Sequence, residues 1–108
     1  IERMGGRRLK HIVISADGDR MVYAVPDAVA NHLEAYGLEF CTTWLENSPH
    51  AEKYRINGVL CYRESDFIDY LNEWIFPDEP SYFVETLGWI DFGDPLPKKY
   101  RDCPEFNF

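Results

Sequence analysis

The sequence lacks any long hydrophobic run and contains few cysteines. No stretch approaches the ~20 apolar residues that a membrane-spanning helix requires, and no signal-peptide hydrophobic region is present. The cysteines are three, an odd number without a Cys-x-x-Cys pair: Cys41, Cys61 and Cys103. That pattern argues against a disulfide framework and favours a reducing compartment. We therefore expect a cytoplasmic protein that does not contact a membrane.

The sequence also lacks the motifs of catalysis and of metal binding. It has no nucleophile elbow, no glycine-rich phosphate loop and no His-Glu-x-x-His pair. The histidines, His11, His32 and His50, are too far apart in sequence for ligand spacing. Asp17 and Asp19 supply too few carboxylates for a calcium loop. We therefore expect no metal and no cofactor.

One trio of side chains has the residue types of a nucleophile, a base and an orienting acid: Cys61, His50 and Asp66. Composition alone supplies such trios in most proteins, so we assign no catalytic residue. The enzymatic or ligand-binding alternative is an aromatic-lined pocket, which would be formed near Trp44, Trp74 and Trp89.

Positive charge is scarce outside the N-terminus. The chain has 11 Lys and Arg residues against 19 Asp and Glu residues, a net charge of −8. Residues 63–94 contain one arginine and nine acidic residues. The net charge of this segment is therefore −8, which equals the net charge of the whole chain. Binding to a phosphate backbone requires cations, so nucleic acid is disfavoured. We expect residues 1–8 to be a flexible basic arm and residues 9–108 to be one domain.

Two β-rich runs, residues 9–15 and 20–25, flank the turn signal Asp17-Gly18. Asp-Gly favours a type I′ turn, which needs positive φ at both central residues. A two-residue loop places Ile14 opposite Met21. One face of this hairpin is then strongly apolar, and we expect the helices to cover it.

Residues 27–46 predict a single long amphipathic helix, because their apolar side chains span one arc of roughly 80°. The stripe consists of Val29, Leu33, Tyr36, Phe40 and Trp44. Gly37 interrupts the helix at a cost of up to ~1 kcal/mol, and close approach of a strand is the expected reason. Leu38 and Leu45 fall on the opposite side, where either the C-terminal segment or a second copy of the chain would cover them.

The segment after this helix contains two short motifs that are typical of helix ends and turns. Ser48-Pro49 is typical of a short helix with Ser48 as its N-cap. Asn57-Gly58 indicates either a small hairpin within residues 54–62 or the end of that short helix.

Residues 65–76 predict a second amphipathic helix with Ser65 as its N-cap. Its apolar side chains span roughly 120°. Asp66, Asp69 and Glu73 fall on the opposite side, where we expect them to be solvated and to titrate near their ordinary values.

Residues 81–90 predict a strand with apolar residues on both faces, which favours a central position beside the hairpin. Residues 91–108 are too rich in aromatic side chains for a disordered tail, so we expect an extended segment docked on the domain. The fold class is α+β, in the order β-β-α-(short helix or hairpin)-α-β. A small antiparallel sheet is expected to be packed on one face by the two helices.

A small, acidic, aromatic-rich chain without catalytic motifs favours a protein that binds a macromolecular partner: a regulator, an inhibitor or an immunity-type protein. Charge of one sign on one face steers oppositely charged partners, so a basic protein partner fits best. The expected surface consists of Asp66, Asp69, Glu73, Asp78 and Glu79. A homodimer is the other open arrangement, through Leu38 and Leu45 or through an exposed sheet edge.

Overall fold

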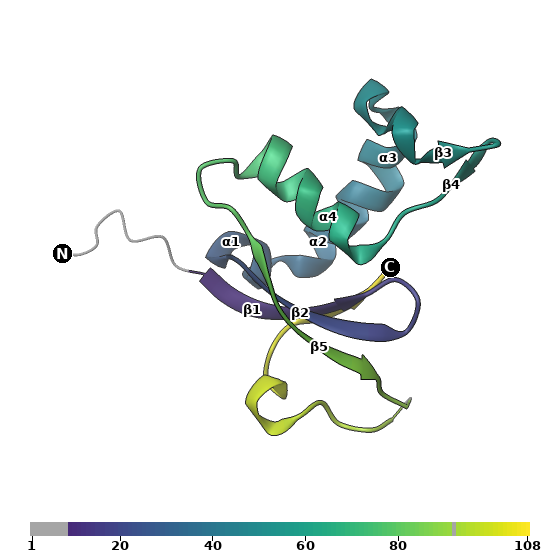
Figure 1. Ribbon diagram of the computed structural model, residues 1–108. Helices are drawn as coiled ribbons and strands as arrows, with labels where there is room; N and C mark the ends of the chain where they lie inside the picture. Colours follow the sequence, from purple (N-terminus) through teal and green to yellow (C-terminus); the bar gives the residue numbers. More distant parts are fainter. Residues whose placement is uncertain (1–8, 92) are drawn as a thin grey trace.

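The computed structural model describes residues 9–91 and 93–108, so the arm expected at residues 1–8 lies outside the described residues. The chain has an α+β fold in which helical segments cover one face of a four-stranded sheet (Figure 1). The strands of this sheet are β1 (Leu9–Ser15), β2 (Asp19–Pro26), β5 (Tyr82–Trp89) and β6 (Glu105–Asn107). Their order across the sheet is β5-β2-β1-β6.

β1 and β2 form the predicted hairpin in the predicted register, with Ile12 opposite Tyr23. The turn differs from the prediction, because only Gly18 of the two central residues has a positive φ, of 100°. The turn is therefore not of type I′. The carboxylate of Asp17 instead accepts a hydrogen bond from the backbone N–H of Asp19 at 3.2 Å.

The hairpin supplies the two central strands of the sheet. β5 pairs antiparallel with β2, and β6 pairs parallel with β1. Two predictions are therefore wrong: the sheet is mixed rather than antiparallel, and the strand within residues 81–90 lies at an edge. The apolar residues on both faces of β5 have another cause. Phe83 contacts Tyr23 on the helix side, whereas Val84 and Leu87 pack against a small cluster on the opposite face.

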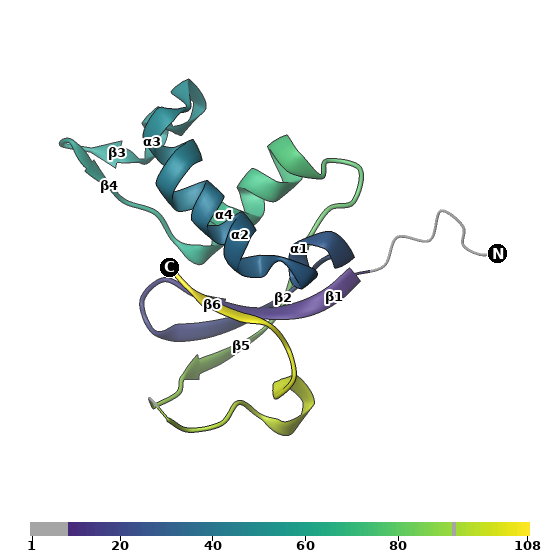
Figure 2. The ribbon, with the colours of Figure 1, turned by 180° about the vertical axis from the view of Figure 1, so that it is seen from behind.

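The predicted single helix over residues 27–46 is broken at His32, whose φ of −137° and ψ of 41° are not helical. α1 (Asp27–Asn31) lies along the sheet, and α2 (Leu33–Leu38) rises from it in a new direction (Figure 2). Lys10 of β1 anchors α1 through an ion pair with Asp27 at 2.9 Å. Apolar residues are buried both in the helix before the break and in the helix after it. An amphipathic pattern that fits one straight helix does not predict such a break.

A π-helical turn explains why Leu45 is not on the surface. Residues Glu39–Trp44 form a π-helix between α2 and α3 (Leu45–Asn47), and the N–H of Leu45 bonds to the carbonyl of Phe40, five residues earlier. This wider turn rotates the following residues back by roughly one position. Leu45 is therefore buried, whereas Leu38 remains 43% exposed. The predicted Leu38–Leu45 dimer surface is wrong.

The segment after α3 contains both of the elements that the sequence left open. They are a 3-10 helix (Pro49–Tyr54) and a small hairpin that consists of β3 (Arg55–Ile56) and β4 (Val59–Leu60). Ser48 is the predicted cap, since its hydroxyl accepts the N–H of His50 at 3.1 Å. Asn57 and Gly58 have φ values of 53° and 82°, so a short hairpin follows the 3-10 helix.

The second predicted helix is present, but it begins before Ser65. α4 spans Glu64–Tyr70 and continues as a π-helical segment, Leu71–Ile75. The N-cap is Arg63, and the carboxylate of Asp66 accepts its backbone N–H at 2.8 Å. The carboxylate of Asp66, and not the hydroxyl of Ser65, therefore satisfies a backbone N–H at the start of α4. The prediction of Ser65 as the N-cap is wrong.

The main core lies between the helices and the sheet and is centred on Phe40, which is fully buried. Its ring contacts five other rings, those of Trp44, Tyr62, Phe67, Tyr70 and Phe108, at centroid distances of 5.1–6.0 Å. The reason predicted for Gly37 is confirmed, because the ring of Phe106 in β6 lies where a Cβ would project.

The C-terminal stretch is docked on the domain, as predicted, and it reaches both faces of the sheet. A 3-10 helix (Lys98–Tyr100) places Tyr100 on the face opposite the helices, where it packs with Val13 and Val22. β6 then returns to the sheet, and Phe106 and Phe108 pack against the main core.

Candidate functional site

The acidic residues predicted on the second helix do gather on one side of it. Asp69 and Glu73 are exposed, and Asp66 is half-buried. Burial raises the pKa of Asp69 above its ordinary value, and the charges of Asp66 and Glu73 raise it further. The expectation of ordinary titration is therefore wrong for Asp69. Asp66 and Glu73 therefore lie close enough to Asp69 for their charges to disfavour its ionised form.

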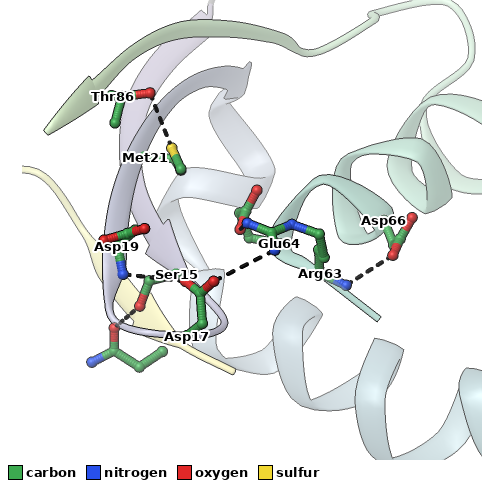
Figure 3. Close-up of polar contacts among 9 residues, drawn as sticks. Ser15, Asp17, Asp19, Met21, Arg63, Glu64, Asp66 and Thr86 are labelled. Atoms are coloured by element: carbon green, nitrogen blue, oxygen red, sulfur yellow. Dashed lines mark hydrogen bonds and ion pairs between the residues drawn. The ribbon is translucent and has the colours of Figure 1, made fainter. Parts of the chain in front are cut away.

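Asp66 differs from its two neighbours because it also holds the start of α4. Its carboxylate caps Arg63, and the guanidinium of Arg63 approaches the carboxylate of Asp17 in the hairpin turn at 3.4 Å (Figure 3). These contacts fix the end of the helix against the sheet. Asp69 and Glu73 are the members of the row with the clearest access to solvent.

The two acidic residues of the linker continue from this helix. Asp78 is exposed and Glu79 is half-buried, and the backbone N–H of Glu79 bonds to the carbonyl of Phe76 at 3.1 Å. The side chain of Asn72 closes the linker by bonding both backbone groups of Ser81, at 2.7 and 3.1 Å. These bonds tie the helix, the linker and the start of β5 together. We use the name acidic surface for the five acidic residues predicted on this stretch: Asp66, Asp69, Glu73, Asp78 and Glu79.

Glu64 is a buried acid that the sequence did not single out. It is 3% exposed, and its Oε1 accepts no hydrogen bond from the described residues. The nearest cation is the guanidinium of Arg63, 3.6 Å away. Burial raises the pKa of Tyr23 to about 12, with the charges of Glu64 and Asp69 as the next causes. The sequence signal that could have drawn attention to Glu64 is its position beside the predicted N-cap Ser65, because the first helical turn often carries acidic residues.

The edge strand β5 exposes large apolar side chains that sequence reasoning assigned to a central strand. Tyr82, Phe83 and Trp89 are 56%, 52% and 68% exposed. The ring of Phe83 meets the edge of Tyr23 at a centroid distance of 5.6 Å. Tyr23 thus contacts the exposed part of β5 through Phe83, and its pKa is raised by burial first and then by the charges of Glu64 and Asp69 on α4.

The three tryptophans do not converge on one pocket. Trp44 and Trp74 are neighbours, with centroids 6.5 Å apart, and His50 stacks on Trp74 at 4.4 Å. Trp89 lies against Gly18 of the hairpin turn instead. The predicted aromatic pocket is therefore not formed by these residues.

A cavity of about 440 Å³ lies between the hairpin turn and the start of α4. Its lining combines Arg63 and Asp66 with the exposed Cys61, and its aromatic members are Tyr62 and Phe108. Cys61 and Asp66 thus share a cavity, but His50 is stacked on Trp74. The trio with the residue types of a catalytic triad is not assembled.

Among residues 9–91 and 93–108, no group of three or more His, Cys, Asp or Glu side chains is arranged to hold a metal ion. Within the same ranges, no helix has the length and apolar character needed to cross a membrane. Comparison of the chain with protein-family models, with curated proteins and with solved structures found no match.

Proposed function

We propose that this protein acts by binding a basic segment of a partner protein at the acidic surface, without catalysis of its own. The observation that supports this proposal is the row of carboxylates on α4 and the π-helical segment after it, in which Asp69 and Glu73 are exposed and the charge of Glu73 disfavours the ionised form of Asp69. A cation bound between them would relieve that repulsion. The net charge of −8 would add long-range steering of a basic partner.

We propose an intracellular location for this interaction. All three cysteines are free thiols, and Cys61 is exposed. An exposed free thiol is typical of a reducing compartment, where disulfides do not persist. Fractionation of the source cells would test a cytoplasmic location.

The test is affinity capture from an extract of the source cells, quantified by mass spectrometry. Asp69→Lys/Glu73→Lys reverses the exposed charges and leaves the helix cap at Asp66 intact. A matched control, Glu34→Lys/Asp102→Lys, makes the same change of net charge at exposed positions elsewhere. We expect the first variant to lose partners that the wild type and the control retain, and we expect high salt to weaken the retained binding.

Partners that remain bound to the Asp69→Lys/Glu73→Lys variant, at wild-type levels, would overturn the assignment of the surface. Circular dichroism of both variants would show whether they are folded. We expect both to keep the fold, because all the substitutions are on exposed side chains.

A further inference from the structure

The outer side of β5 is an open sheet edge. Within the described parts of the chain, β5 pairs only with β2, and no backbone hydrogen bond joins its outer side to another segment. β5 runs along the front of the sheet in Figure 1, and β6 does so in the reverse view of Figure 2, so the two edges face opposite sides. β5 has eight residues, whereas β6 has three. The longer edge presents the longer row of unpaired N–H and C=O groups.

β5 lacks two common protections of an edge strand, lysine and proline, although its ladder with β2 contains two register shifts. Natural edges are commonly blunted by lysine or proline, and the sequence of β5, YFVETLGW, contains neither. It exposes Tyr82 and Phe83 at its start and Trp89 at its end. Exposed aromatic side chains beside unpaired backbone groups are features of a surface that another strand can cover.

The surroundings of this edge are acidic at both of its ends and on its helix side. Glu79 precedes the strand and the exposed Asp91 follows it. On the helix side, Phe83 contacts Tyr23, whose pKa is raised by burial first and then by the charges of Glu64 and Asp69 of α4. A strand added to β5 would therefore direct alternate side chains toward carboxylates.

We propose that the outer edge of β5 binds an extended, basic segment of the partner protein as an added strand. Side chains of alternate residues in that segment would contact Phe83 on the helix side and Tyr82 on the opposite face. This proposal rests on the proposed function, because the acidic surface supplies the charge complementarity that selects a basic occupant.

A second copy of the chain fits this edge less well than a basic peptide. Each copy has a net charge of −8, so pairing two copies would bring like charges together. In addition, the β2–β5 ladder shifts register twice, between Arg20 and Met21 and between Val22 and Tyr23. Such bulges twist an edge and limit the length over which another strand can pair, which favours a short flexible segment.

The test uses the full chain and a short synthetic peptide that alternates lysine and valine, followed by NMR of the backbone amides. We expect shift changes and slower hydrogen exchange in β5. Two control peptides have the same sequence and are N-methylated at alternate residues, one at the odd and one at the even positions. Each keeps the charge of the parent peptide but loses backbone N–H donors for strand pairing. At least one of the two methylated peptides should bind about tenfold or more weakly, because several backbone hydrogen bonds are lost.

Two variants locate the binding. Phe83→Lys places a charge on the edge and should weaken peptide binding about tenfold, the size expected from like-charge repulsion plus lost apolar contact. Ile56→Lys makes the same change at a similarly exposed position of β3, 57% against 52%, and should leave binding unchanged.

Strand addition is overturned if both N-methylated peptides bind like the parent peptide, or if the wild type binds no peptide at low salt. Shift changes confined to α4, with loss of binding only in Asp69→Lys/Glu73→Lys, would overturn strand addition while supporting the acidic surface. A dimer by light scattering whose β5 amides are protected without peptide would also overturn it, since a second copy would then occupy the edge.

Discussion

The two faces of the sheet are packed in different ways. On the helix side, the fully buried Phe40 is surrounded by aromatic rings from helices, from the segment before α4 and from the C-terminus. On the opposite face, a small cluster of Val13, Val22 and Tyr100 is covered by the chain that precedes β6. The comparison indicates that the helix side supplies most of the stability, whereas the opposite face is a cover that can open locally.

The opposite face adds polar contacts at the edge of its small apolar cluster. The hydroxyl of Tyr100 donates a hydrogen bond to the carboxylate of Glu85 on β5, and the ammonium of Lys99 pairs with the same carboxylate at 3.0 Å. Because the side chains of Lys99 and Glu85 are 69% and 38% exposed, the contribution of their ion pair is screened by solvent and salt. This face should therefore respond to pH and ionic strength before the helix side does.

The largest effect is expected for Phe40→Ala. Removing this ring leaves a cavity among its aromatic neighbours, which should lower the free energy of unfolding by ~3–5 kcal/mol. Chemical denaturation with urea measures that loss. Val22→Ala, which removes fewer atoms from the smaller cluster, should cost less. Equal losses in the two variants would contradict the difference between the faces.

A smaller effect is expected for Gly37→Ala, which tests how tightly β6 packs on α2. The new Cβ would lie 2.8 Å from the ring of Phe106, so the gain in helix propensity should be outweighed by overpacking. We expect a net loss of about 1–2 kcal/mol, estimated from the same two effects. Ala35→Gly, at an exposed position of the same helix, calibrates the propensity. A stabilised Gly37→Ala variant would show that Phe106 can move away freely.

The smallest effect is expected for Tyr100→Phe and should depend on pH. The hydrogen bond from Tyr100, followed by that from Lys99, lowers the pKa of Glu85 below its ordinary value of 4.5. A lowered pKa contributes stability above pH 4.5 that is lost as the pH falls through the pKa of the folded state. Thermal melts between pH 7 and pH 3 should show a shallower loss for Tyr100→Phe than for the wild type. Parallel profiles would show that this contact does not stabilise the fold.

The sequence predicted the elements that follow strong local patterns. The register of the hairpin follows from alternation around Asp17-Gly18, and the Ser48 cap and the Asn57-Gly58 hairpin follow from turn chemistry. The aromatic C-terminal stretch was correctly expected to dock. These features are decided by residues close to one another in the chain.

The features that the sequence did not predict depend on distant contacts. A 3.6-residue period cannot show the π-helical turn that buries Leu45, nor the break at His32. A strand with apolar residues on both faces looks central, so the edge position of β5 was missed; its second face is covered by Tyr100 and its neighbours. The acids of α4 were placed on the correct side, but the cap formed by Asp66 and the burial of Glu64 require the hairpin beside them.

Native-state hydrogen exchange of the wild type, followed by NMR at micromolar concentration without any peptide, tests the open edge most directly. We predict that amides of β1 and β2 that bond within the sheet exchange only through global unfolding. In β5, the amides that face β2 should be protected, and those that face outward should exchange at rates close to those of unpaired amides. Uniform protection along β5 would contradict an open edge and, with it, the proposed addition of a partner strand.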